Sequence, residues 1–354
     1  MNHPSIEISG RTIGMGQPCY IIAELSANHG QSLEKAKSLV RAAAEAGADA
    51  IKLQTYRADT ITIDCDAPPF QVGKGSAWEG RRLYDLYEEA HTPWEWHRDL
   101  FEEAAAVGLH CFSSPFDSTA ITLLEELDTP AYKIASFEIV DHDLIRRCAK
   151  TGKPVIISTG MASREEVSEA VEVARAAGCQ ELALLRCVSS YPAPPEEMNL
   201  ATIQDLWDSF ACPVGLSDHT LGTAIPVAAA TLGATIIEKH LTFRRADGGP
   251  DSHFSLEPEE FAEMVKAVHD ATASIGQVSY EITEAQTSSR SFRRSLFAVK
   301  DIAQGEILTE ENIRSIRPGD GLPPKHLPEI LGKTAKTAIP FGTPLTWEHL
   351  ESSS

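Results

Sequence analysis

The chain has 354 residues, 42% of them hydrophobic, which is enough for one large packed domain and a small one. Its 51 acidic and 31 basic side chains give a formal net charge of -20, which argues against nucleic acid or an anionic membrane surface as a partner. An anionic substrate would have to be held by a few local cations.

The seven cysteines are scattered and never spaced as C-x-x-C, which favours neither a disulfide framework nor a thiolate zinc site. Residues 1–10 lack the basic and apolar regions of a signal peptide, and no stretch approaches the roughly 20 uninterrupted apolar residues that cross a bilayer. We therefore expect a cytoplasmic protein with no membrane partner.

In chain order, alternating apolar and polar residues predict a short hairpin over residues 5–13. From Cys19 onward one unit repeats, in which an apolar, β-branched run ends in polar residues and is followed by a helical pattern. The expected strands are residues 19–25, 50–55, 110–116, 131–136, 154–160, 182–189, 213–219 and 234–240.

Eight strand and helix units within roughly 270 residues match a (β/α)8 TIM barrel, an α/β fold whose active site lies at the carboxyl ends of the strands. Polar residues end all eight expected strands. A doubly wound open sheet is the alternative, but it would build a site only from the strands beside its switch point. The polar ends therefore favour a closed barrel.

The rest of the chain divides into an insertion, a linker and a tail. Residues 56–96 form a long excursion after the second strand, where a lid or binding loop is expected. We expect the barrel domain with its hairpin to span residues 1–280, a polar linker residues 281–294, and a small, largely irregular or β-rich domain residues 295–354.

Two of the expected strands, joined by a short helix, end in His219 and His240. A right-handed crossover between parallel strands places both ends side by side. One such histidine is more often structural, but two that converge on a catalytic face favour a divalent metal such as manganese, iron, cobalt or zinc. Glu24 is a candidate third ligand or general base, with a helix-capping carboxylate as the alternative.

Lys52 and Lys133 lie near the ends of barrel strands, where an unpaired ammonium is costly unless it meets an anion. Structural ion pairs with Glu24 or Glu138 are the alternative. Together with Ser114, Ser136, Ser158 and Ser217, the two lysines have the composition that holds phosphate and carboxylate oxygens. The residues therefore predict a phosphorylated acid as substrate.

Motifs along the whole barrel resemble the sialic acid synthases, and the tail with RPGDG resembles their antifreeze-like (SAF, β-clip) domain. These motifs are IIAELSANHG, IKLQTY, FSSPFD, YKIAS, ISTGMA, CVSSYPAPP, GLSDHTLG, EKHLTF and GGPDSHFSLEP. Within the family, LYDLYEEAHTPWEWH, SYPAPPEEMNL and DGGPDSHFSLEP are most similar to the branch that uses 2,4-diacetamido-2,4,6-trideoxy-altrose, with the N-acetylneuraminate and legionaminate branches as alternatives.

The resemblance implies a transferase that condenses phosphoenolpyruvate with the open-chain sugar and water, giving a nine-carbon sugar acid and phosphate by carbon–oxygen cleavage. It implies a divalent metal, Mn2+ first and Mg2+ or Co2+ otherwise, on His219 and His240, and a domain-swapped homodimer. Glu24, Lys52, Lys133 and Glu138 are the implied catalytic residues. The implied substrate-binding residues are Gln54, Ser114, Ser136, Ser158, Ser189, Ser217, Asp251 and, from the other subunit, Arg317.

Two further readings remain open from the residues. A Schiff-base aldolase would use Lys133 or Lys52 as its nucleophile. A carbohydrate-binding protein with a decayed barrel would lack polar residues at some strand ends, and here none of the eight ends lacks them.

Overall fold

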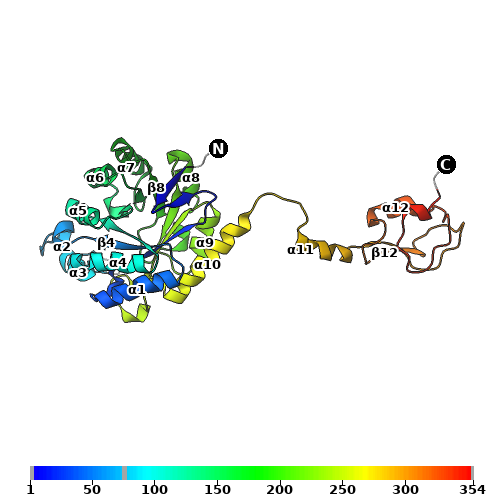
Figure 1. Ribbon diagram of the computed structural model, residues 1–354, viewed down its shortest axis with the longest axis horizontal. Helices are drawn as coiled ribbons and strands as arrows, with labels where there is room; N and C mark the ends of the chain where they lie inside the picture. The colour runs from blue at the N-terminus through cyan, green and yellow to red at the C-terminus, as the bar shows by residue number, and fades with distance from the viewer. Residues whose placement is uncertain (1–3, 74–77, 352–354) are drawn as a thin grey trace. The chain divides into compact units, whose positions relative to one another are not determined.

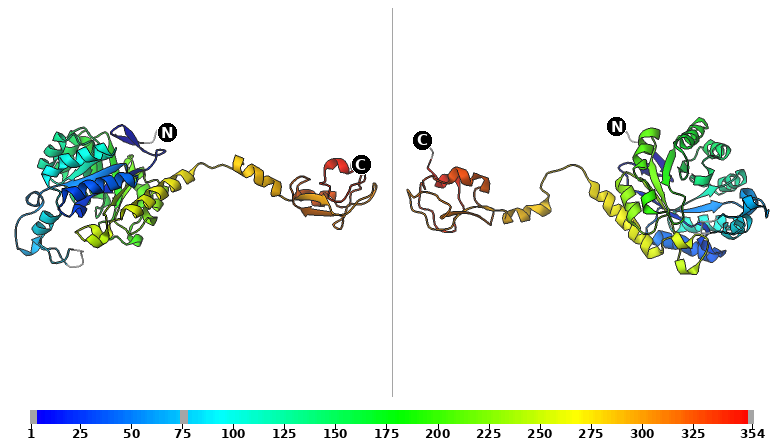
Figure 2. Two further views of the ribbon diagram at one scale, coloured as in Figure 1. Left: turned by 60° about the horizontal axis from the view of Figure 1, so that its bottom comes forward. Right: turned by 180° about the vertical axis from the view of Figure 1, so that it is seen from behind.

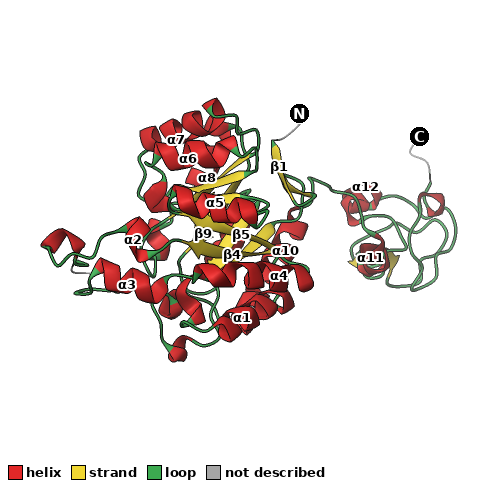
Figure 3. Cartoon of the chain, turned by 60° about the vertical axis from the view of Figure 1, so that its left-hand side comes forward, coloured by secondary structure: helices red, strands yellow, loops and turns green. Residues whose placement is uncertain are grey.

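In this computed structural model the described residues are 4–73 and 78–351. The chain forms two compact units, Met1–Gly276 and Gln277–Ser354. In the first unit, helices surround the strands on all sides (Figure 1, Figure 3). None of the helices in the described part is long and apolar enough to cross a membrane.

The first unit is a closed barrel of eight parallel strands in the order β10-β3-β4-β5-β6-β7-β8-β9. This confirms the predicted (β/α)8 fold. The strands are β3 (Tyr20–Glu24), β4 (Ala50–Thr55), β5 (His110–Pro115), β6 (Tyr132–Ile134), β7 (Val155–Ser158), β8 (Leu182–Cys187), β9 (Val214–Asp218) and β10 (Ile236–His240).

One outer helix follows each barrel strand and packs its apolar face against the sheet. Local capping fixes where several of them begin; Ser32, for example, accepts a hydrogen bond from the backbone N–H of Lys35. The helices are α1 (Leu33–Glu45), α4 (His97–Ala106), α5 (Ser118–Glu126), α6 (His142–Lys150), α7 (Arg164–Ala176), α8 (Thr202–Phe210), α9 (Ala224–Thr231) and α10 (Pro258–Ile275).

The barrel interior is apolar in its lower part and polar at the carboxyl ends of the strands. Because side chains alternate along a strand, every second residue faces the interior. On β10, Ile236 belongs to the interior apolar cluster, and Glu238 and His240 follow it at intervals of two. On β4, Ala50 is followed in the same way by Lys52 and Gln54. The strand period therefore delivers charged side chains to the top of the barrel.

The predicted hairpin is present as β1 (Ser5–Ile8) and β2 (Arg11–Gly14), paired antiparallel. Its Ile6, Ile8 and Ile13 are fully or almost fully buried in the interior apolar cluster. The hairpin and the excursion after β4 lie at opposite ends of the barrel (Figure 2). The hairpin thus closes the bottom, as expected.

The excursion is less irregular than the sequence suggested. Short helices α2 (Ala58–Ile61) and α3 (Leu83–Ala90) pack against each other. In the chain, the 3-10 turn Pro68–Phe70 lies between them and the 3-10 turn Trp94–Trp96 follows α3. Residues 74–77 of the excursion lie outside the described residues. The four residues of α2 are too few to show a helical period, whereas α3 does show one in Leu83, Leu86, Tyr87 and Ala90, which the prediction overlooked.

The second unit begins with exposed residues and the short helix α11 (Glu284–Thr287). It is organised around β11 (Ser295–Ala298) and β12 (Ile313–Ile316), which pair antiparallel, and short helix α12 (Leu327–Ile330). Its own apolar cluster includes Leu296, Ile313 and Leu345. The unit is small, largely irregular and β-rich, as the Gly- and Pro-punctuated sequence predicted.

Candidate active site

A cavity of about 500 Å³ lies at the carboxyl ends of the barrel strands. Most of the site residues predicted from the sequence line it. They are Glu24, Lys52, Gln54, Lys133, Ser136, Glu138, Ser158, Ser217, His219, His240 and Asp251.

Four buried charged side chains form the floor of this cavity. Lys52 Nζ lies 2.5 Å from Glu24 Oε2 and 3.9 Å from Glu238 Oε2, and Lys133 Nζ lies 3.5 Å from Glu238 Oε1. Each of the four side chains is at most 5% exposed. Two ammonium groups thus face two carboxylates, and an incoming dianion would find cations that are already partly neutralised.

Burial and mutual attraction shift the pKa values of these groups. Burial raises the pKa of Glu24 to about 7, against the opposing attraction of Lys52. Burial alone would raise the pKa of Glu238, but Lys133 and Lys52 outweigh it and lower this pKa. Burial lowers the pKa of Lys133. Glu24 is therefore able to exchange a proton near neutral pH.

The hydroxyl groups expected around the lysines are found on the neighbouring strands. Ser114 Oγ accepts a hydrogen bond from Lys52 Nζ at 3.3 Å, and Ser217 Oγ donates to Glu238 Oε1 at 2.8 Å. Ser158 Oγ is buried with no hydrogen-bond partner in the described part of the chain. An unpaired buried hydroxyl at a cavity wall is suited to a ligand oxygen.

In the turn after β7, the backbone at Gly160 lies very close to Ser136 and Ser189. Gly160 N–H donates to Ser136 Oγ at 3.1 Å, and a Cβ on Gly160 would collide with Ser136 and Ser189. Ser189 Oγ is buried without a hydrogen-bond partner within the described residues. Glycine is required here because the three chain segments meet with no room for a side chain.

The two histidines converge as the strand ends predicted. Their ring centroids are 5.4 Å apart. His219 Nδ1 lies 2.9 Å from the carbonyl oxygen of Val188, and this contact leaves Nε2 for a ligand. His240 Nδ1 is buried with no hydrogen-bond partner in residues 4–73 and 78–351. Burial lowers the pKa of His240 well below its usual value, so its imidazole is neutral, the form that binds metals.

These two nitrogen donors fit a divalent metal whose other ligands are water or substrate. No group of three or more His, Cys, Asp or Glu side chains in the described residues is arranged to hold a metal ion. Glu24, the candidate third ligand, is instead bonded to Gln54 Nε2 at 3.0 Å and to Lys52. Two histidine ligands would leave the other positions of such a metal to water and substrate, as in catalytic metal sites.

An ion pair on the outer face of the same strands supports the turn that carries His219. Lys239 Nζ lies 2.5 Å from Asp218 Oδ2, and both side chains are fully buried. Asp218 also accepts hydrogen bonds from the backbone and hydroxyl of Thr220 at 3.0 and 3.1 Å. These bonds hold His219 between two fixed neighbours.

The residues expected to contact the sugar line the same cavity as the four charged side chains of the floor. Burial raises the pKa of Glu138 to about 7, and its Oε2 has no hydrogen-bond partner in the described part of the chain. Asp251 accepts hydrogen bonds from Ser26 Oγ and the backbone N–H of Ala27. Both carboxyl groups line the cavity and are available to a polyhydroxylated ligand.

Arg317 belongs to the second unit, so its predicted role stays a prediction. Sequence reasoning also placed Glu238 and Cys187 among the polar residues at the strand ends, but it gave no role to them or to Tyr191. Glu238, not Glu138, forms the second carboxylate of the ion pairs with the lysines. Cys187 Sγ lies 3.8 Å from His219 Nδ1. The ring centroid of Tyr191 lies 4.5 Å from that of the His219 imidazole. The two-residue spacing from interior positions was the signal for Glu238 and Cys187.

Comparisons with known proteins agree with this geometry. The NeuB family profile matches residues 39–280, and the SAF domain profile matches residues 293–351. The chain is 47% identical to a pseudaminic acid synthase of Campylobacter jejuni over 92% of this chain and 95% of the relative, and 45% identical to a pseudaminic acid synthase of Helicobacter pylori over 96% and 100%.

Among solved structures, the chain is similar to the N-acetylneuraminic acid synthetase of Leptospira borgpetersenii in complex with citrate. The TM-score is 0.72 at 31% identity, over 81% of this chain and 95% of that chain. The identity to the two pseudaminic acid synthases is thus higher than the identity to this synthetase.

Proposed function

This chain belongs to the NeuB family, and from that premise we propose that it is a pseudaminic acid synthase. The reaction joins phosphoenolpyruvate, 2,4-diacetamido-2,4,6-trideoxy-altrose and water into pseudaminic acid and phosphate. One observation carries the proposal: two buried lysines with a set of hydroxyls, and two converging histidines, face the same cavity at the top of the barrel.

Phosphoenolpyruvate binds through Lys52, Lys133 and the surrounding serines. The ammonium groups meet its phosphate and carboxylate oxygens, and Ser136, Ser158 and Ser217 add hydroxyl contacts. Because the four floor charges are buried, these contacts act in a medium of low dielectric and are strong. Ser114, which accepts a hydrogen bond from Lys52, and Ser189, whose Oγ is buried without a hydrogen-bond partner in the described residues, add two further hydroxyl contacts to phosphoenolpyruvate.

The sugar aldehyde lies beside the two histidines, with Gln54, Glu138 and Asp251 along the rest of the sugar. A divalent metal, Mn2+ first, would be held by His219 and His240 and would supply Lewis-acid polarisation of the aldehyde. Holding both reactants in one cavity removes most of the entropic cost of their encounter.

The bonds change as follows. Carbon 3 of phosphoenolpyruvate attacks the aldehyde carbon, water adds to carbon 2, and phosphate leaves with its bridging oxygen. Glu24 takes the proton that the attacking water loses, and Glu138 donates a proton to the oxygen of the former aldehyde. Both carboxyl groups have pKa values raised to about 7 by burial, which suits proton transfer near neutral pH.

An isotope experiment tests this chemistry. With Mn2+, the altrose derivative and phosphoenolpyruvate labelled with 18O at the bridging oxygen, we expect the label in the released phosphate, as mass spectrometry would show. Unlabelled phosphate would place the cleavage at phosphorus and contradict the mechanism. A Schiff-base aldolase, favoured only by the lowered pKa of Lys133, would instead give a borohydride-trapped pyruvate adduct without consuming phosphoenolpyruvate.

We also propose a domain-swapped homodimer in which Arg317 contacts the sugar in the other subunit's barrel. Mixing an Arg317→Ala protein with a His240→Ala protein should then restore part of the activity that each lacks alone. A guanidinium near the sugar would bond its hydroxyl or amide oxygens. Mixed dimers isolated with two affinity tags and found inactive would place Arg317 outside the partner's site.

A further inference from the structure

The cavity is divided between two kinds of surface. Side chains at the barrel strand ends are mostly polar, but every lining side chain that comes from the described part of the excursion, residues 56–73 and 78–96, is apolar or aromatic. We name this second surface the apolar wall. It consists of Tyr56, Ile61, Val72, Trp78, Leu83, Leu86, Tyr87 and Ala90.

We propose that the apolar wall is a specificity determinant, which receives the methyl groups of the sugar and selects a 6-deoxy, diacetamido hexose over a sugar with a hydroxyl at carbon 6. The inference rests on the proposed function and deepens it. Ile61, Val72 and Leu83 are only half-buried, so part of each remains open toward the cavity. An apolar surface that is not covered by the protein itself is available to apolar groups of a ligand.

The chemistry of the sugar fits such a wall. A 2,4-diacetamido-2,4,6-trideoxy hexose carries three methyl groups, two on its acetamido substituents and one at carbon 6. N-acetylmannosamine carries one methyl group and a hydroxyl at carbon 6. A hydroxyl placed against the wall would lose its hydrogen bonds to water without gaining a partner. A sugar with more methyl groups is therefore expected to bind more tightly to the apolar wall.

The position of the wall fits the far end of the sugar. The aldehyde carbon must lie near the histidines and the lysines at the barrel axis, where carbon 3 of phosphoenolpyruvate attacks it. Carbon 6 is the other end of the chain and points away from this floor. Tyr56, which immediately follows β4, packs edge-on against Tyr87 at 5.7 Å and Phe116 at 5.1 Å and so joins the floor to the wall.

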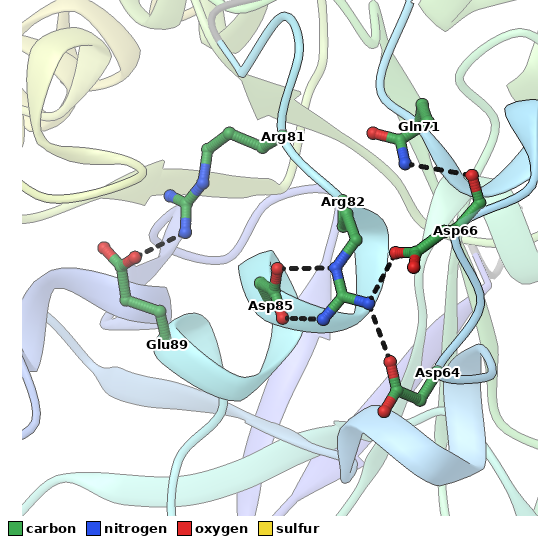
Figure 4. Close-up of polar contacts among 7 residues, drawn as sticks. All are labelled: Asp64, Asp66, Gln71, Arg81, Arg82, Asp85 and Glu89. Atoms are coloured by element: carbon green, nitrogen blue, oxygen red, sulfur yellow. Dashed lines mark hydrogen bonds and ion pairs between the residues drawn. The ribbon is translucent and has the colours of Figure 1, made fainter.

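A cluster of ion pairs centred on Arg82 links the segments of the excursion that carry the wall (Figure 4). The guanidinium binds Asp85 through two bonds of 2.6 and 2.7 Å and binds Asp64 and Asp66 at 2.8 Å each. It thereby connects the residues after α2 to the first turn of α3. Leu83, the next residue, lines the cavity.

A short backbone ladder fixes Val72 against the same segment. Its N–H donates to the carbonyl of Arg81 at 2.8 Å, and its carbonyl accepts from Gly80 N–H at 3.0 Å. Arg81 in turn pairs with Glu89 on α3 at 2.5 Å. Because these contacts already order the apolar wall in the free protein, little conformational entropy is lost when the sugar binds. This favours discrimination between sugars.

Two substitutions test the wall by making it polar with little change of shape. Val72→Thr replaces a methyl group by a hydroxyl, and Leu83→Asn replaces the isopropyl group of leucine by a carboxamide. We measure kcat/KM by phosphate release with the 6-deoxy altrose derivative and with its 6-hydroxy analogue. The wild-type protein should prefer the deoxy sugar by about 10- to 100-fold, and each variant should reduce this preference at least threefold.

Ile63→Thr is the matched control, because Ile63 lies in the same excursion, is 56% exposed and does not line the cavity. It should keep the wild-type preference. The KM for phosphoenolpyruvate should be unchanged in all three variants, which excludes general damage to the floor. A wild-type protein that turns over both sugars equally, or two folded variants with the wild-type preference, would overturn the inference.

The experiment distinguishes an error in the inference about the apolar wall from an error in the proposed function. If the wild-type protein releases no phosphate with the deoxy altrose derivative, the function itself is wrong. If it does so without discriminating at carbon 6, only the wall is wrong.

Discussion

Replacing Lys133 by methionine is expected to lower kcat/KM for phosphoenolpyruvate by about 30-fold to several thousand-fold, because truncating one member of a buried charge pair costs roughly 2–5 kcal/mol. Two effects add. The substrate loses a cation that is 3% exposed, and Glu238 is left buried at the floor with its charge less compensated. Most of the loss should appear in KM for phosphoenolpyruvate, measured by phosphate release at a saturating sugar concentration.

A double variant separates the role of Lys133 in binding from its role in the stability of the floor. Lys133→Met with Glu238→Gln removes both charges, so the melting temperature should recover relative to Lys133→Met alone, whereas KM should stay high. Lys153→Met is the matched control, because Lys153 pairs with Glu125 and does not line the cavity. A normal KM in a folded Lys133→Met protein would show that phosphoenolpyruvate lies elsewhere.

The fold was predictable because its signals are local and repeated eight times. A strand such as β4 was expected with its observed bounds, Ala50–Thr55, since β-branched and apolar residues end abruptly at polar ones. The closure of the barrel also followed from the sequence, because only a closed sheet uses polar ends on all its strands. The same local logic placed His219 and His240 together, since they end adjacent strands.

The sequence named a pair between a lysine and Glu24 as an alternative, and Lys52 makes it, but the ion pairs with Glu238 at the floor could not be predicted in the same way. They depend on the register between strands and on distances across the barrel axis, which no short stretch of sequence encodes. Lys133 on β6 reaches Glu238 on β10, although these strands are not neighbours in the sheet. Glu138 was one of the two alternative partners named from the sequence, but it lies one turn beyond the strand end.

The apolar wall was hidden for a different reason. Its residues come from two short helices and a loop, and their apolar side chains show no period that distinguishes a ligand surface from a small core. The acidic side chains between them are solvent-exposed, and nothing in their sequence spacing shows that they meet at one arginine. Only the structure shows that Arg82 gathers three of these acids, while Leu83 beside it faces the cavity.

Removing one imidazole should have the other large effect. In His240→Ala we expect Mn2+ affinity to fall by at least about 100-fold and kcat by about 1000-fold, since Lewis-acid stabilisation is worth several kcal/mol. Mn2+ binding is measured directly, from the paramagnetic resonance signal of the free ion without substrates. His142→Ala is the control, because His142 lies on α6 with a side chain 39% exposed and should bind Mn2+ as the unchanged protein does.

The direct binding measurement decides between two roles for His240. Its Nδ1 has no hydrogen-bond partner in the described residues, and a purely structural histidine buried beside Phe254 would leave that nitrogen unsatisfied at a cost. A His240→Phe protein, which keeps the ring packing, should therefore be at least as stable as the wild type on thermal unfolding while it loses Mn2+. If it keeps Mn2+ and activity, the histidine is a packing residue and the metal lies elsewhere.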